Sequence, residues 1–296
     1  METQHVIIIG AGPGGLSTAL QLKRYGILPL IFEKDQVGGL LNNANLVENY
    51  PGFPKGIPGP ALVKLFIDQL QNHSIPIVNE KVEVLQFRKE NFQVRTDRQE
   101  YHSNILVIAS GTKPRRFTDI KIPKEIQGQV FYQVYPLLHL SGKRIAIVGA
   151  GDAAFDYALN LARGNEIEIL NRGEQVSCLP LLWERAKQSP RIHYHPGTKI
   201  STLHPTIDRS ISLECQTPAG QVVFEVDSLV GAIGREPQLD FISGQFSKKA
   251  IQLENSGDLY YVGDVINGLY RQTAIAVGNG ILTAMKIYNH LQESNL

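Results

Sequence analysis

The chain has 296 residues, more than a single hydrophobic core usually serves, so we expect two domains. Its composition of 43% hydrophobic and 19% charged residues is that of an ordinary globular protein, and a formal net charge of +1 gives no electrostatic basis for binding nucleic acid or an anionic membrane. The apolar run at the N-terminus is too short for a signal segment, and no later run approaches the ~20 apolar residues of a membrane span, which favours a soluble, cytoplasmic protein.

The N-terminal stretch HVIIIGAGPGGLSTALQLKRYGILPLIFEK predicts a buried strand, a glycine turn, an amphipathic helix through Tyr25 and a second strand that ends at Glu33. Gly10, Gly12 and Gly15 have the G-x-G-x-x-G spacing. In that pattern the first glycine permits the turn, the second lets the backbone approach a pyrophosphate, and the third lets the helix pack on the strand. A carboxylate at the end of the second strand accepts hydrogen bonds from ribose hydroxyls, so this module predicts a dinucleotide site.

The next stretch, residues 37–59, is rich in glycine, proline and asparagine and predicts a long functional loop. We expect a helix over 60–73 after it, followed by strands at 80–87, 91–96 and 104–111. The last of these strands ends in the small residues ASG and runs into a linker that contains proline.

A second module, KRIAIVGAGDAAFDYALNLARGNEIEILNR, repeats the first one after an intervening domain-sized stretch. Gly149 and Gly151 take the places of the first two glycines, and Ala154 takes the third. Two such modules suggest two nucleotides held near each other, as when a reduced nicotinamide must meet a flavin. The alternative is a second module that is retained only for packing.

The tip of the second strand in this module reads Asn171, Arg172, Gly173, Glu174. An acidic residue at the tip favours a nucleotide with a free 2′-hydroxyl, and basic residues favour a 2′-phosphate. Asn171, the position directly after the strand, is not a carboxylate, and Arg172 is the one cation that follows, so the choice of cofactor is open.

Strands at 198–205, 210–217 and 222–234 follow as a meander, and the last one again runs into a linker that contains proline. The two strand-linker stretches NILVIASGTKPRR and SLVGAIGREPQ are the predicted hinges of an inserted domain. They divide the chain into a discontinuous domain of 1–112 and 236–296 and an insert of 113–235.

The final segment predicts a strand that ends at Gly263 and Asp264, a loop, and a long amphipathic helix whose first turn begins near Arg271. The N-terminus of a helix offers free amides to an anionic or electron-rich group. This segment is therefore a second candidate contact for a nucleotide cofactor.

Taken together, the motifs resemble those of the low-molecular-weight thioredoxin reductases and related FAD-dependent pyridine nucleotide-disulfide oxidoreductases. The resemblance runs along nearly the whole chain through GAGPGG, GGLL, ENYPGF, ASGT, GAGDAA, IGREP, GDV and YRQTA. It implies an α/β fold with two Rossmann-like dinucleotide-binding domains, in which an FAD domain (1–112 and 236–296) carries an inserted NAD(P)-type domain (113–235). It also implies a homodimer.

The resemblance assigns roles to individual residues. Asp264 would bond the ribityl chain of FAD, the stretch from Arg271 through Gln272 to Thr273 would present main-chain amides to the flavin ring, and Asn49 would lie beside that ring. Leu40 stands where thioredoxin reductases usually have glutamine. The positions assigned to FAD are Gly10, Gly12, Pro13, Gly14, Gly15, Glu33, Lys34, Gly39, Leu40, Asn49, Val82, Ala109, Gly111, Asp264, Arg271, Gln272 and Thr273. Those assigned to NAD(P)H or a second dinucleotide are Gly149, Gly151, Asp152, Ala153, Ala154 and Arg172.

The chain departs from the family in QVFYQVYPLLHL, residues 129–140, where thioredoxin reductases carry a C-x-x-C redox pair. Here the four positions from Tyr132 to Tyr135 contain no cysteine. The family's dithiol route needs one sulfur to attack and a second to resolve, so we expect an activity other than thioredoxin reduction. Tyr132, Tyr135 and Asp156 are candidates for groups near the flavin, and packing alone is the other interpretation of the two tyrosines.

The nucleotide signature departs as well, because NADPH-dependent members carry three arginines where this chain has Arg172, Gly173 and Ser177. The leading hypothesis is an FAD oxidoreductase that exchanges electrons with a small redox protein or small molecule, with NAD(P)H as second substrate. One alternative is a ferredoxin or flavodoxin NADP reductase of thioredoxin-reductase type, and another is a non-enzymatic flavin sensor.

A third alternative is a flavoprotein whose second site holds another flavin or no nucleotide, similar to diflavin-linked disulfide oxidoreductases. Its thiols would be Cys178 and Cys215, the only two cysteines. His193 and His195 have no partner at metal-ligand spacing, so no metal site is expected.

Overall fold

The computed structural model of the chain describes residues 4–293 and divides into two compact units. Unit 1 contains the residues up to 42, residues 47–113 and those from 236 onward, and unit 2 contains residues 43–46 and 114–235. The boundaries drawn from the sequence place all of 1–112 in one domain, whereas the short stretch 43–46 groups with unit 2. Within residues 4–293 no helix is both long and apolar enough to cross a membrane.

Unit 1 is built on a sheet in the order β3-β2-β1-β6-β5-β4, in which β17 also pairs with β6. Its parallel strands are β1 (Gln4–Ile9), β2 (Leu30–Glu33), β3 (Ile77–Asn79), β6 (Glu100–Ile108) and β17 (Leu259–Tyr261). An antiparallel extension is formed by β4 (Val82–Arg88) and β5 (Asn91–Thr96). Because β1 and β6 are parallel neighbours, the glycine turn after β1 and the ASG sequence after β6 meet at one edge of the sheet.

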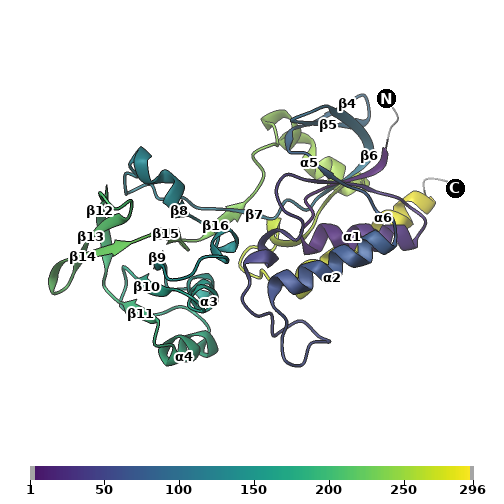
Figure 1. Cartoon of the computed structure of the whole chain (residues 1–296). Coiled ribbons are helices and arrows are strands. Elements are labelled where there is room, and N and C mark those ends of the chain that lie inside the picture. The colour runs from purple at the N-terminus through teal and green to yellow at the C-terminus, as the bar shows by residue number, and fades with distance from the viewer. Residues whose placement is uncertain (1–3, 294–296) are drawn as a thin grey trace. The chain divides into compact units, whose positions relative to one another are not determined.

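The two faces of this sheet are covered by different elements (Figure 1). Side chains alternate along a strand, so Val6 and Ile8 of β1 pack in one cluster with α1 (Pro13–Arg24), α2 (Gly59–Asn72) and α6 (Thr273–Glu293). Ile7 and Ile9 pack in a second cluster with α5 (Gly244–Ser256) and the β4–β5 hairpin. Burial on both faces explains why β1 is a continuous apolar run rather than an alternating one.

Unit 2 repeats this plan with a parallel sheet in the order β11-β10-β9-β15-β8. Its strands are β8 (Val130–Phe131), β9 (Arg144–Val148), β10 (Glu166–Leu170), β11 (Ile192–His195) and β15 (Ser228–Gly231). Ile145 and Ile147 face α3 (Asp152–Leu161) and α4 (Pro180–Gln188), whereas Ala146 faces an antiparallel sheet. That sheet consists of β12 (Lys199–Pro205), β13 (Ile211–Thr217) and β14 (Gly220–Val226).

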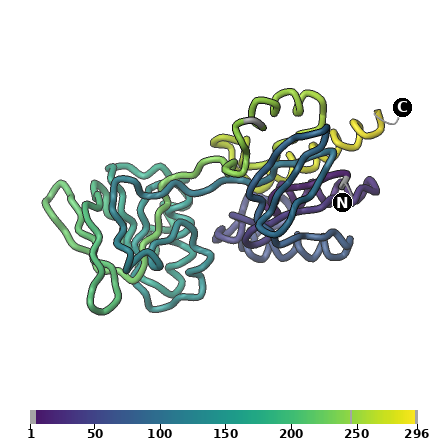
Figure 2. Tube along the Cα trace, turned by 90° about the horizontal axis from the view of Figure 1, so that it is seen from above, coloured from purple at the N-terminus to yellow at the C-terminus, as the bar shows by residue number. Residues whose placement is uncertain are grey.

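The two linkers between the units pair with each other. Strands β7 (Thr112–Pro114) and β16 (Arg235–Pro237) form a two-stranded ladder, and Figure 2 shows the two chain segments running side by side. At the unit 1 end, the ammonium of Lys113 lies 3.3 Å from the Glu236 carboxylate and 2.5 Å from that of Asp240.

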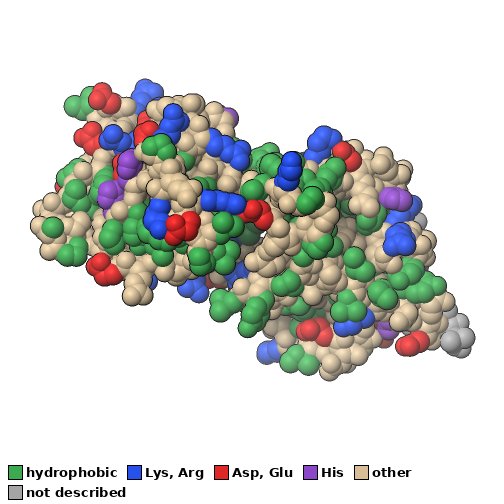
Figure 3. Space-filling model, turned by 90° about the horizontal axis from the view of Figure 1, so that it is seen from below, with side chains coloured by type: hydrophobic (Ala, Val, Ile, Leu, Met, Phe, Trp, Pro, Cys, Tyr) green, Lys and Arg blue, Asp and Glu red, His purple; other side chains and the backbone are tan. Residues whose placement is uncertain are grey.

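On the face drawn in Figure 3, positive and negative side chains are interspersed.

These observations confirm the predicted fold class, and the differences from the sequence-based elements are local. The helix expected over 60–73 spans Gly59–Asn72, and the loop 37–59 contains a 3-10 helix, η1 (Gly39–Asn43). A bridge between Val47 and Ile57 also closes that loop. Helix α5 was not predicted, because it buries little apolar surface beyond Phe246 and Leu253 and its exposed positions are mostly polar.

Candidate functional site

The first glycine turn is shaped by close backbone contacts on one side and open space on the other. Gly10 has a positive φ of 107°, and a Cβ there would collide with the carbonyl of Ala109. A Cβ on Gly15 would collide with the carbonyl of Gly10, and one on Gly14 would lie 2.8 Å from Val262 Cγ1. Gly12 differs, because a Cβ there would meet nothing within 4 Å.

The open side of Gly12 coincides with the start of α1, where Pro13 is the first helical residue and no side chain caps the helix. No side chain caps the amides of the first turn, and they lie beside open space. A pyrophosphate in that space could approach the backbone closely and accept hydrogen bonds from these amides. This geometry fits the pyrophosphate of a dinucleotide, as the glycine spacing predicts.

Glu33, at the end of β2, is bonded to two backbone amides. Its Oε2 accepts a hydrogen bond of 2.8 Å from the Ala11 N–H, and its Oε1 accepts one of 3.0 Å from the Asp35 N–H. The carboxylate therefore ties the glycine turn to the strand that follows the helix. Lys34 is paired with Asp35 at 3.7 Å, so its ammonium is held on the same loop.

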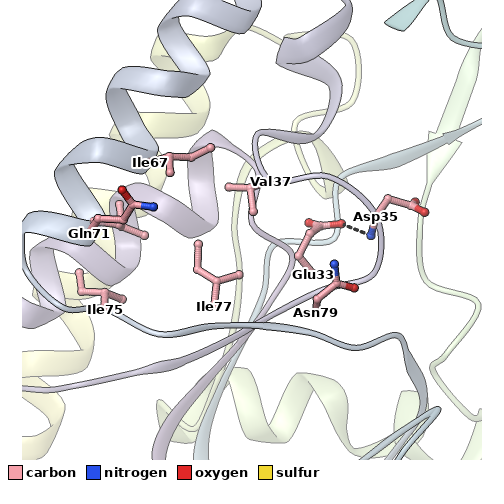
Figure 4. Close-up of a pocket in the computed structure, with 9 residues that line it drawn as sticks. Glu33, Asp35, Val37, Ile67, Gln71, Ile75, Ile77 and Asn79 are labelled. Carbon is pink, nitrogen blue, oxygen red and sulfur yellow. Dashed lines mark hydrogen bonds between the residues drawn. The ribbon is translucent and has the colours of Figure 1, made fainter. Parts of the chain in front are cut away.

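A cavity of about 320 Å³ opens beside Glu33 (Figure 4). Polar side chains from the end of β2 and the end of β3 form one part of its wall, and apolar side chains from α2 form another. The lining residues are Glu33, Asp35, Val37, Ile67, Leu70, Gln71, Ile75, Ile77 and Asn79. Val82 is buried in the core of unit 1 and is not among them. A mixed polar and apolar cavity beside Glu33, the acid predicted to bind ribose, would suit the adenosine end of a dinucleotide.

The other predicted FAD positions of unit 1 come from three separate parts of the chain. Gly39 and Leu40 begin η1, which lies against the glycine turn, because a Cβ on Gly39 would be 3.7 Å from the Cα of Gly12. The Asn49 amide donates a hydrogen bond of 2.8 Å to the side-chain oxygen of Gln272. This bond brings together two predicted flavin contacts that are 223 residues apart in sequence.

Gln272 directly precedes α6, whose first residue is Thr273, and Arg271 lies next to it. Asp264 lies in η4 (Gly263–Val265), which packs on the first turn of α6, where a Cβ on Gly263 would be 3.4 Å from that of Ala276. At the neighbouring sheet edge, Ala109 is buried and Gly111 faces open space. The elements expected to hold the flavin therefore all end at the same edge of unit 1.

The second glycine turn has the same construction with less open space. Gly149 has a φ of 144°, and a Cβ there would lie 2.5 Å from the Ala232 carbonyl oxygen. A Cβ placed on Gly151 would lie 3.7 Å from Ser177 Oγ and would meet nothing else within 4 Å. Asp152 accepts a hydrogen bond of 2.7 Å from the Leu179 N–H. The 177–179 stretch thus borders the place where the sequence predicts a pyrophosphate.

Around this turn, Ala154 is fully buried, whereas Ala153 and Arg172 are exposed. A fully buried alanine at the third position of the motif lets α3 pack on β9, as the third glycine does in unit 1. The geometry fits a second dinucleotide, with Arg172 as a cation at the strand tip.

Tyr132 is partly buried and packs against other residues of unit 2. Its ring lies 5.6 Å from that of Phe117 between centroids, and the guanidinium carbon of Arg116 lies 5.1 Å from the centre of the Tyr132 ring. Its hydroxyl accepts a hydrogen bond of 3.2 Å from the Phe117 N–H, and a Cβ on Gly231 would lie 2.8 Å from the ring. These contacts support the packing interpretation for Tyr132. The role of Tyr135 near a flavin stays a prediction.

Sequence reasoning missed a hydrogen-bonded segment, Asn43–Leu46, which interrupts unit 1 and belongs to unit 2. The side-chain oxygen of Asn43 accepts hydrogen bonds from the N–H groups of Val134 and Tyr135, at 2.9 and 3.0 Å. The Asn45 N–H donates to Asp156 Oδ2 at 3.0 Å. The polar run NNAN at residues 42–45 is the only signal in the sequence, and it names no partner.

Asp156 is therefore an acceptor for this segment. Burial raises the pKa of its carboxyl to about 6, and the hydrogen bond from Asn45 and the charge of Arg163 limit that increase. A carboxyl that titrates near neutral pH suits proton exchange, which keeps Asp156 as a candidate for a role near the nucleotide.

The cysteines do not form a pair. Both are free, and they lie in different core clusters, Cys178 beside α4 and Cys215 on β13. Burial raises the pKa of the Cys178 thiol and raises that of Cys215 to about 11, so both thiols are protonated at neutral pH. This arrangement argues against the redox pair of the diflavin-type alternative.

The histidines singled out in the sequence are bonded to carboxylates on the neighbouring strand. His195 Nε2 lies 2.7 Å from Glu168 Oε2, and His193 Nε2 lies 3.5 Å from Glu166 Oε2. Within residues 4–293 no group of three or more histidine, cysteine or acidic side chains is arranged to hold a metal ion.

Comparison with known proteins places these features in context. Residues 4–280 match the family described as pyridine nucleotide-disulphide oxidoreductase. The chain is 27% identical to NADPH-dependent thioredoxin reductase 3 of Arabidopsis thaliana over 99% of this chain and 59% of that protein, and 25% identical to the thioredoxin reductase of Mycolicibacterium smegmatis over 99% of each. The crystal structure of T. acidophilum thioredoxin reductase is similar with a TM-score of 0.85 and 25% identity, covering 99% of this chain and 100% of that one.

The raised pKa of Asp156 predicts a pH-dependent stability. Between pH 3.8 and about pH 6, Asp156 holds a proton in the folded protein and releases it in the unfolded chain. Its contribution to the free energy of unfolding is therefore full below pH 3.8 and is lost as the pH rises through about 6. Asp156→Asn keeps an oxygen that accepts from Asn45 but cannot ionise. We expect its free energy of unfolding to fall by about 1 kcal/mol less than that of the wild type between about pH 5 and pH 8.

Urea unfolding of the two proteins at both pH values measures this difference. Asp68→Asn, a change at an exposed carboxylate on α2, is the control and should follow the wild type. An identical pH dependence in wild type and Asp156→Asn would contradict the raised pKa.

Proposed function

Because the chain belongs to the pyridine nucleotide-disulphide oxidoreductase family, we propose that it passes electrons between a bound FAD and a diffusible partner without an active-site dithiol. The family binds FAD and NADPH, and the chain is accordingly an FAD-dependent oxidoreductase.

The pair of glycine turns, each followed by a helix with an uncapped N-terminus, is the observation that carries the proposal. Around the first turn, Glu33 and the loop with Gly39 and Leu40 would hold the adenosine diphosphate part of FAD. The bonded pair of Asn49 and Gln272, together with the start of α6, would hold the flavin end. A bound flavin supplies the ability to take up a hydride and to release electrons singly or in pairs.

The second turn would hold the adenosine diphosphate part of NAD(P)H, with Arg172 near its 2′ position. Arg172 is the only one of the three expected cation positions that carries a charge, so NADH and NADPH are both candidates. What this part of the chain does for the reaction is to bind and orient the nicotinamide donor.

The absence of C-x-x-C from the sequence supports a route without protein thiols. Tyr132 stands where the resemblance expects the first cysteine, and its ring is packed against Phe117. The two thiols of the chain are free, with Cys215 buried and Cys178 partly exposed. Electrons would therefore leave the flavin directly to a small redox protein or small molecule that reaches it. Homodimer formation stays a prediction from the resemblance, and a cytoplasmic location stays a prediction from the sequence.

Anaerobic titration with a reduced nicotinamide tests the proposed second substrate. We expect the purified protein to be yellow and its flavin absorbance to bleach when NADH or NADPH is added. Bleaching by one nucleotide only would identify the donor. If neither bleaches a protein that retains FAD, the nicotinamide donor is excluded, and a second site with another flavin or with no nucleotide becomes the better interpretation.

Replacing Gly12 tests where the pyrophosphate binds. A leucine side chain at Gly12 would fill the open space beside the first turn of α1, and we expect FAD to bind roughly 100-fold more weakly, a loss of about 2.7 kcal/mol. FAD content per polypeptide after purification measures the effect. Gly244→Leu is a matched control, because Gly244 also faces open space in unit 1. Full FAD retention by Gly12→Leu would show that the pyrophosphate lies elsewhere.

Changing both tyrosines separates packing from a role at the flavin. The double variant Tyr132→Phe and Tyr135→Phe keeps both rings and removes both hydroxyls, so a purely packing role leaves flavin reduction and reoxidation unchanged. A severalfold change in only one half-reaction would instead show that a hydroxyl acts near the flavin or its partner. Stopped-flow absorbance measures the two half-reactions separately.

A further inference from the structure

The short segment Asn43–Leu46 lies between residues that are assigned to the flavin on both sides. Leu40 precedes it by three residues and Asn49 follows it by three. Three residues span at most about 10 Å, so little slack separates the segment from either flavin contact. A displacement of the segment must therefore be passed on to η1 or to the bonded pair of Asn49 and Gln272.

The same segment is anchored on unit 2, to which it belongs. Asn43 is 2% exposed, and its side-chain oxygen accepts the two N–H groups of Val134 and Tyr135 at the start of η3 (Tyr135–Leu137). The Asn43 carbonyl accepts a third hydrogen bond, of 3.3 Å, from the Asn160 amide. A buried amide with this many polar contacts fixes one geometry, because any other leaves buried donors without an acceptor.

Helix α3 provides the remaining anchors. Asp156 accepts from the Asn45 N–H, and Arg163, just beyond the helix, donates a hydrogen bond of 2.6 Å to the side-chain oxygen of Asn45. Asp156, Asn160 and Arg163 are spaced by four and three residues, which places them on one side of the helical path. Asp156 lies only about one helical turn from Asp152, the first residue after the glycine turn.

One segment is thus joined directly to the helix that begins at the second glycine turn and, through its flanks, to the loop that holds the flavin. We propose that Asn43–Leu46 is a coupling segment that transmits nucleotide binding at the second glycine turn to the flavin, with Asn43 as its positioning residue. This inference rests on the proposed function, since it requires a nucleotide at each turn. By thermodynamic reciprocity, the redox state of the flavin then changes the affinity of the second site.

The test uses the FAD-loaded protein and two probes that lack nicotinamide, ADP-ribose and its 2′-phosphate. Neither probe can exchange a hydride, so any effect of the flavin on their binding passes through the protein or through space. Calorimetry gives the Kd of each probe for the oxidised and the dithionite-reduced protein. We expect the two Kd values of the bound probe to differ by at least about fivefold in the wild type, the lower end of typical coupling between sites.

Three variants locate the coupling. Asn43→Ala removes the acceptor for Val134 and Tyr135 and should bring the ratio of Kd values close to 1, whereas Asn43→Asp retains an acceptor oxygen at this position and should keep the wild-type ratio. Arg163→Met changes an exposed side chain and should lower the ratio even if Asn43→Ala folds poorly. A direct effect through space would persist in all three.

Asn165→Ala is the matched control. Asn165 is also a buried asparagine of unit 2, and its side chain makes three hydrogen bonds, with the Lys143 N–H and with the carbonyls of Leu140 and Leu161. Its loss should destabilise the protein but leave the ratio at the wild-type value.

The outcomes separate the two proposals. Binding of neither probe would overturn both the second nucleotide site and the coupling. Binding with equal Kd values in the two redox states of the wild type would overturn the coupling alone. A ratio that survives Asn43→Ala and Arg163→Met, or that Asn165→Ala also abolishes, would show that the segment is not the carrier.

Discussion

The close approach of backbone to backbone at the end of β1 is the constraint on which the rest of unit 1 depends. The carbonyls of Gly10 and Ala109 occupy the space where a side chain on Gly15 or Gly10 would lie, so helix α1 can start directly above the sheet edge. That position leaves the first-turn amides uncapped and Gly12 open. Once the helix start is fixed there, Glu33, η1 and the beginning of α6 all converge on it. Unit 2 repeats the constraint at Gly149 and Ala232, with the Ser177–Leu179 stretch narrowing the open side.

Much of this could be predicted from the sequence because the signals are local. The apolar runs of β1 and β9, the glycine spacing and the acid at the end of β2 each lie within a few residues of the feature they predict, and steric rules link them to structure. Helix α5 could not be predicted in the same way, since its burial depends on a hairpin far away in sequence. The bond between Asn45 and Asp156 joins residues 111 positions apart, and neither residue carries a pattern that names the other.

The aromatic segment around Tyr132 stands where the resemblance expects a C-x-x-C pair, and its side chains are packed. Phe117 and Gly231 surround the Tyr132 ring, and Arg116 lies near it, so the segment is integrated into the core of unit 2. The next two residues, Val134 and Tyr135, keep a polar connection through their backbone to Asn43. In this short stretch the side chains pack and two main-chain amides bond to Asn43, so packing alone does not exclude the proposed role near the cofactor.

The ladder formed by β7 and β16 has a consequence for how such a protein can arise. The chain leaves unit 1 and returns to it on adjacent strands, tied at their base by Lys113, Glu236 and Asp240. For unit 1, which is the host domain, the inserted unit is equivalent to the loop of a hairpin. The entropy of closing such a loop depends only weakly on its length. A gene segment encoding a whole nucleotide-binding module can thus be exchanged for another if the new module also accommodates Asn43–Leu46, which packs in unit 2. Recombination at these two strands would let one flavin scaffold acquire new electron donors.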